Sequence, residues 1–110
     1  MEETLQGVMD IQLRTQVVLY PKLKGMTQEQ MFLENTRAMV HEVIETENEV
    51  NWKHWKLPVP VDEDKLKGEI ADQFIFLINQ CNIAGMDANE LLGLTLDKIN
   101  INIDRQSNGY

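Results

Sequence analysis

Four stretches of the sequence carry apolar side chains at helical spacing, and short breaks containing proline or glycine separate them. We predict helices over residues 2–20, 28–50, 64–82 and 88–103. Capping-box patterns begin the second helix, at Thr27 and Gln30, and the fourth, at Asp87 and Glu90. Gly85 ends the third. Since strand signals are weak, the pattern predicts an all-α fold, a four-helix bundle-type unit.

Length and charge narrow the class of protein. The chain has 110 residues, so we expect one domain over 1–110. Ten basic and 18 acidic side chains give a net charge of -8, which argues against a nucleic-acid polymer or an anionic membrane as partner. The single cysteine, Cys81, suits a reducing compartment, and we interpret it as a core residue. The acidic start at Glu2 and Glu3 is unlike a signal peptide, so we expect a soluble cytoplasmic protein.

Two pairs of carboxylates stand on consecutive predicted helices. Glu42 and Glu45 are three residues apart, as are Glu69 and Asp72, so each pair shares one helix face. A single pair of this kind is most often a solvated surface. The third helix, however, is apolar over residues 74–78 and leaves little room for a solvated side. Two antiparallel helices would bring the pairs together as a cage of oxygen ligands for Mg²⁺, with Mn²⁺ as a substitute.

Other residues extend or limit this prediction. Glu49 lies two turns beyond Glu42 and is a reserve ligand, and Asn79 lies two turns beyond Asp72, where it could hydrogen-bond a ligand. A di-iron bundle would need Glu-x-x-His pairs. Neither of the two histidines follows a glutamate at that spacing, so we discount that metal.

The paired carboxylates resemble those of the all-α nucleoside triphosphate pyrophosphohydrolases, which include MazG-like proteins and dimeric dUTPases. The segment from Trp52 to Lys56 looks like the Trp-Lys-x-Trp-Lys segment of dimeric dUTPases. The ending also resembles the phosphate-binding pattern of that branch, through Lys98, Asn102, Arg105 and a final Gly109-Tyr110.

The resemblance implies hydrolysis of a nucleoside triphosphate, most often dUTP, to the monophosphate and pyrophosphate with Mg²⁺. It implies the following roles. Glu42 and Glu45 would be catalytic; Glu42, Glu45, Glu69 and Asp72 would hold metal; Lys56, Lys98, Asn102, Arg105 and Tyr110 would bind phosphate; Gln12, Gln16, Trp52 and Asn79 would bind the base. Related enzymes build the cleft between subunits, so we expect a homodimer or homotetramer.

Two alternatives stay open. The asparagine that dimeric dUTPases place soon after the base-reading glutamine is not evident, because Thr15 and Gln16 stand there. A MazG-like house-cleaning enzyme acting on other canonical or modified nucleotides is therefore the nearest alternative. A non-enzymatic acidic helical interaction module would explain the helices and the charge, but not two matched carboxylate pairs beside a separate cationic face.

Overall fold

The computed structural model of the chain describes residues 3–19 and 25–109, and this part is all-α, as predicted. The helices are α1 (Leu5–Leu19), α2 (Gln28–Glu47), α3 (Glu63–Ala84) and α4 (Ala88–Ser107). All four predicted helices are present. Their ends differ from the prediction by a few residues, most of all at the end of α4, which continues beyond residue 103.

Local sequence explains where the helices begin and end. Thr27 and Gln30 form the predicted capping box at the start of α2. The Asp87 side chain accepts a hydrogen bond from the backbone N–H of Glu90 at the start of α4. Asp62 caps α3 in the same way, so that helix begins earlier than its apolar pattern indicates. Gly85 ends α3 in the left-handed region, at a φ of 77°, where a side chain would be strained.

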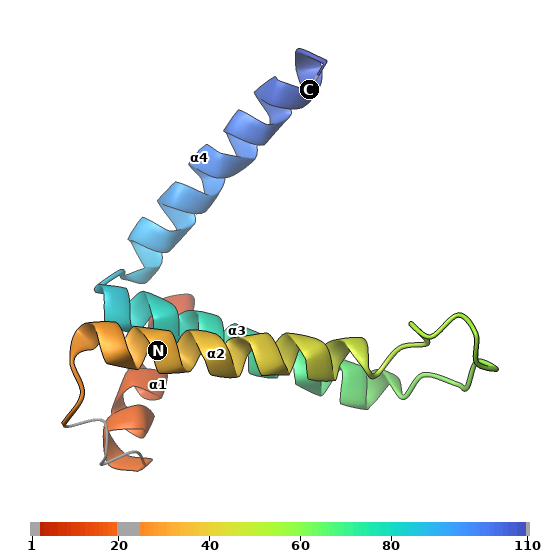
Figure 1. The fold of residues 1–110 in the computed structure, drawn as a ribbon. Helices are drawn as coiled ribbons and strands as arrows, with labels where there is room; N and C mark the ends of the chain where they lie inside the picture. The colour runs from red at the N-terminus through yellow and green to blue at the C-terminus, as the bar shows by residue number, and fades with distance from the viewer. Residues whose placement is uncertain (1–2, 20–24, 110) are drawn as a thin grey trace.

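Helices α2 and α3 form an antiparallel pair with one constant register (Figure 1). The Asn79 side chain donates to Asn35 at 3.0 Å, and Lys65 pairs with Glu49 at 3.3 Å. The same number of residues separates the two α2 partners as separates the two α3 partners. One face of α2 therefore meets one face of α3 over four turns, and the candidate site lies along this contact.

The buried core is small and lies where α1 and the start of α4 meet α3. Met9, Ile78, Cys81 and Ala88 form it, so the prediction that Cys81 is a core residue is confirmed. The Asn82 side chain donates to the backbone oxygen of Met9 at 3.1 Å and helps to hold α1 across α3.

Helix α4 leaves the group formed by the other three helices after its first turn (Figure 1). The expected bundle is therefore realised by α1–α3, and α4 projects from it. The large apolar residues along α4 are exposed: Leu92, Leu94, Leu96, Ile99, Ile101 and Ile103. The accessible surface is 8627 Å², against about 6,200 Å² expected for a compact monomer of 12.7 kDa. The radius of gyration is 17.3 Å, against about 13 Å for a compact domain of this length.

Among the described helices, none combines the length and apolar character needed to cross a membrane.

Candidate active site

Three of the four predicted metal ligands converge between α2 and α3. Glu42, Glu69 and Asp72 each offer a carboxylate oxygen, and these oxygens lie within 4.8 Å of one another. One oxygen of Glu42 and one of Glu69 are buried and have no hydrogen-bond partner among the described residues. Buried carboxylate oxygens without a partner are costly, and either a bound cation or a proton would offset this cost.

The electrostatics of Glu42 point the same way. Burial raises the pKa of its carboxyl above the ordinary value, and the negative charges of Glu45, Asp72 and Glu69 raise it further. A bound cation would reverse this effect, because it favours the charged carboxylate.

The chemistry of this donor set fits a hard divalent cation. All the donors are carboxylate oxygens, which suit Mg²⁺ or Mn²⁺ better than a soft metal. The three residues that would hold it, Glu42, Glu69 and Asp72, come from two helices held in fixed register.

The other two acidic residues considered from the sequence lie outside this cluster. Glu45 is exposed, and its charge acts on Glu42 from the next turn of α2. Glu49, the reserve ligand, pairs with Lys65 instead. The structure therefore brings together three of the four expected carboxylates, and it leaves Glu45 at the rim.

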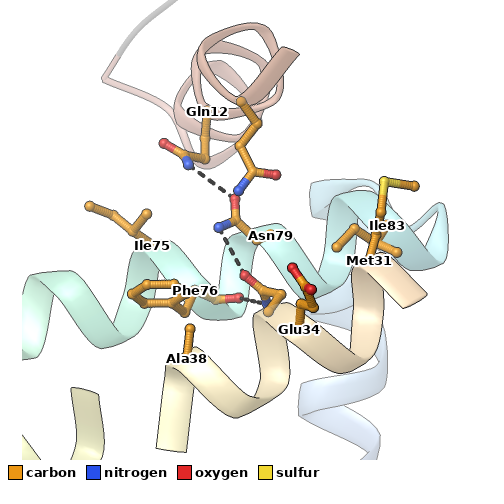
Figure 2. Close-up of a pocket in the computed structure, with 10 residues that line it drawn as sticks. Gln12, Met31, Glu34, Ala38, Ile75, Phe76, Asn79 and Ile83 are labelled. Atoms are coloured by element: carbon orange, nitrogen blue, oxygen red, sulfur yellow. Dashed lines mark hydrogen bonds between the residues drawn. The ribbon is translucent and has the colours of Figure 1, made fainter. Parts of the chain in front are cut away.

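A cavity of about 320 Å³ opens between α1, α2 and α3 (Figure 2). Three of the residues expected to bind the base line it: Gln12, Gln16 and Asn79. The rest of its wall is mostly apolar and is formed by Met31, Glu34, Asn35, Ala38, Ile75, Phe76 and Ile83.

Three amide side chains form a continuous row of hydrogen bonds in the wall of this cavity (Figure 2). Gln12 Nε2 donates to Asn79 Oδ1 at 3.0 Å, and Asn79 Nδ2 donates to Asn35 Oδ1 at 3.0 Å. Asn35 Nδ2 donates to the backbone oxygen of Phe76 at 2.9 Å. Asn35 and Asn79 are buried, with 8% and 2% of their surface exposed, so the hydrogen bond between them is shielded from water.

The cavity and the carboxylate cluster follow one another along the same face. Asn35 precedes Glu42, and Asn79 follows Asp72, each by two helical turns, or about 10 Å. This separation is comparable to that between the base of a nucleotide and its phosphates. One nucleotide could therefore contact both.

The tryptophan segment does not reach this cavity. It belongs to the connection between α2 and α3, at the end of the pair beyond the carboxylates (Figure 1). Trp52 packs edge-on against Trp55, with ring centres 5.9 Å apart, and donates from its indole N–H to Asn48. Lys56 is exposed in the same connection. The structure thus separates Trp52 from Gln12, Gln16 and Asn79.

The expected phosphate-binding residues of the last helix also lie apart from the carboxylates of their own chain. Lys98, Asn102 and Arg105 lie on the exposed part of α4, which projects away from α2 and α3 (Figure 1). Tyr110 is outside the described residues. The sequence predicted that the cationic face of the last helix lies opposite the carboxylates across the bundle. This prediction is wrong within one chain, because α4 does not join the bundle.

Comparison with known proteins decides the family. Residues 4–83 match the model of the dUTPase family, and this range holds α1, α2, nearly all of α3, the cavity and the carboxylates. The chain belongs to the dUTPase family. The match ends before α4, so it does not cover the expected phosphate-binding residues of that helix. No curated protein and no solved structure matches the chain.

Membership of the dUTPase family makes the chain a dUTPase-like nucleotide hydrolase at the level of the family. The all-α resemblance drawn from the paired carboxylates is thereby confirmed. The family match is compatible with the MazG-like part of that resemblance and does not test it.

Asn35, the centre of the amide row, was not among the site residues predicted from the sequence. A signal was present, because Asn35 lies at helical spacing between Met31 and Ala38 on an otherwise apolar stripe of α2. A polar residue at such a position must find a partner when it is buried.

Proposed function

We propose that this dUTPase-family chain hydrolyses dUTP to dUMP and pyrophosphate with the help of Mg²⁺. One observation carries the proposal: partnerless carboxylate oxygens lie two turns from an amide-lined cavity on the same helix face. The cavity would take the base, and the carboxylates would lie beside the phosphates.

The carboxylates have distinct roles in this proposal. Glu42, Glu69 and Asp72 would hold Mg²⁺, which supplies neutralising charge for the phosphates and lowers the pKa of water when it is bound. Glu45 is exposed beside this cluster, so it can orient the attacking water and accept its proton. Glu42 would stay ionised as a ligand, because a bound cation favours the charged form of the carboxyl and opposes the rise in its pKa caused by burial and the neighbouring carboxylates.

The base would lie against α1. Gln12 and Gln16 are one turn apart and both line the cavity. An amide offers a donor and an acceptor side by side, which matches the N–H and C=O of the uracil imide edge. Trp52 would reach this base only from a second copy of the chain or after movement of its connection.

We further propose that a second copy of the chain completes the site, as a homodimer or within a homotetramer. The chain exposes about 2,400 Å² more accessible surface than a compact monomer of its mass would. This excess is in the range of an obligate homodimer interface. Apolar residues exposed on α2 and α3, such as Val40, Val43, Ile70 and Phe74, are available to meet the apolar residues of α4. Lys98, Asn102 and Arg105 would then serve the phosphates at the partner's carboxylates, and Lys56 would act from the connection.

A substrate panel tests the reaction. We expect the protein to release pyrophosphate and the monophosphate from dUTP, faster than from dCTP or dTTP, and only with Mg²⁺ or Mn²⁺ present. Products are separated by anion-exchange chromatography, and the Asp72→Asn variant is the control for a contaminating hydrolase. Comparable rates on many triphosphates would favour the MazG-like alternative. Absence of hydrolysis and of any nucleotide-induced stabilisation would favour the interaction module.

A further inference from the structure

The amide row in the cavity wall fixes which way the donor and the acceptor of the Gln12 amide point. We propose that Asn35 is the positioning residue that sets this orientation. This inference rests on the proposed function, because it concerns how the same cavity distinguishes bases. It adds a specificity-determining residue in the cavity wall that acts through Asn79 and Gln12.

The backbone of α3 provides the fixed end of the row. The carbonyl oxygen of Phe76 can only accept, so the Asn35 side chain must turn its NH₂ group toward it. The Asn35 oxygen then faces Asn79 and requires the Asn79 NH₂ group. The Asn79 oxygen, in turn, requires the NH₂ group of Gln12. A reversed Gln12 would set two oxygens against each other unless all three amides turned and the Phe76 carbonyl lost its donor.

Gln12 therefore presents one defined pattern to the cavity. Its Oε1 accepts no hydrogen bond from another described residue, and its Nε2 keeps a second hydrogen beside the one given to Asn79. The edge available to a ligand is an acceptor next to a donor, in a fixed order.

This order separates uracil from cytosine. Uracil carries a donor at ring position 3 and an acceptor at position 4, and it pairs with the fixed amide of Gln12. Cytosine in the same position carries an acceptor at 3 and a donor at 4, so it meets two repulsive contacts. A glutamine free to turn over would pair with either base. Thymine has the same edge as uracil, so the row does not distinguish these two.

The test measures selectivity for the base by binding, without turnover. Titration calorimetry with dUMP, dCMP and dTMP is carried out on the wild-type chain, on Asn35→Leu and on Asn35→Ser. The leucine removes both hydrogen bonds of Asn35. The serine hydroxyl can donate or accept, so it tolerates either orientation of Asn79, and it serves if the leucine variant does not fold. We expect the preference for dUMP over dCMP to fall about tenfold in both variants, while the ratio of dUMP to dTMP stays unchanged.

Thr36→Val is the matched control, because Thr36 accepts a hydrogen bond from Gln80 between the same two helices but lies outside the cavity wall. It should keep the wild-type preference. If the Asn35 variants lose affinity for dUMP and for dCMP by equal factors, Asn35 has a structural role only and the inference is overturned. A wild-type chain that binds dUMP and dCMP equally would overturn it as well. Pyrophosphate release from dUTP is scored separately, so the hydrolase proposal stands or falls by its own measurement.

Discussion

Glu49 and Lys65 form an ion pair of 3.3 Å on one side of the carboxylate cluster, and Asn35 and Asn79 are hydrogen-bonded at 3.0 Å on the other. Both contacts join α2 to α3 in the same register. Glu42 and Asp72 lie midway between them, so the helix pair holds the carboxylates together despite their repulsion. A site fixed in this way loses little conformational entropy when a cation binds.

Neutralising a carboxylate of the cluster should lower the activity of the protein and raise the stability of its metal-free form. We expect Glu42→Gln and Asp72→Asn to lower kcat/KM for dUTP by about 10²-fold or more, because each loses a ligand charge. Without a divalent cation both variants should melt at a higher temperature than the wild-type chain, since repulsion falls. Thermal melts with and without Mg²⁺ and steady-state rates check this.

Glu47→Gln is the matched control for these variants. Glu47 is exposed at the end of α2 and lies outside the cluster, so its loss should leave the Mg²⁺-induced rise in Tm intact. Full activity in Asp72→Asn would remove that residue from the site.

The stability of the metal-free chain should depend on pH through Glu42. Its pKa is raised in the folded state, so the folded state binds a proton more readily than the unfolded state does. The resulting contribution to stability is fully present below the unfolded pKa and is lost as the pH rises through the folded pKa. The Tm advantage of Glu42→Gln over wild type should therefore be larger at about pH 8 than at about pH 5. An advantage that shrinks with rising pH would contradict this sign.

The thiol of Cys81 should react slowly in the folded chain. Its side chain is in the core, and burial raises the pKa of the thiol, so both access and the thiolate fraction are low. We expect labelling by a thiol-specific reagent to be slower by about 10²-fold or more in buffer than in denaturant. Fast labelling of a chain that remains helical by circular dichroism would show that the contact between α1 and α3 opens readily.

Most of the fold could be read from the sequence, because helix periodicity and capping residues are local signals. Thr27, Asp87 and Gly85 mark helix ends through bonds to their immediate neighbours. The direction of α4 has no such signal. Its apolar residues show that it needs a partner surface but not whether that surface belongs to the same chain.

The site was predictable in part for a similar reason. Spacing places Glu42 and Glu45 on one helix face, but which of them meets Asp72 depends on the register of α2 against α3. That register is set by long-range contacts such as Asn35 with Asn79. The position of Trp52 depends on the path of the connection, in which Asn51 binds both backbone groups of Val59.

The cationic residues of α4 should act at the carboxylates of a second copy of the chain. If Arg105 serves the partner's carboxylates, Arg105→Ala and Asp72→Asn chains should each be inactive alone. A hybrid dimer of the two should contain one intact site, with Asp72 from one chain and Arg105 from the other. Mixed in equal amounts and allowed to exchange subunits, the two variants should recover about a quarter of wild-type activity, because half of the dimers are hybrids and each holds one good site of two.

Light scattering on the wild-type chain and on each variant establishes that assembly is unchanged. Lys98→Ala should complement Asp72→Asn as Arg105→Ala does, because both basic residues share one face of α4. Glu42→Gln should not complement Asp72→Asn, since both changes damage the same carboxylate cluster and every hybrid site lacks one ligand. Recovery in that pair would show that Glu42 and Asp72 of one chain do not serve the same site. No recovery with Arg105→Ala would place Arg105 in the same chain as the carboxylates it serves, or outside the site altogether.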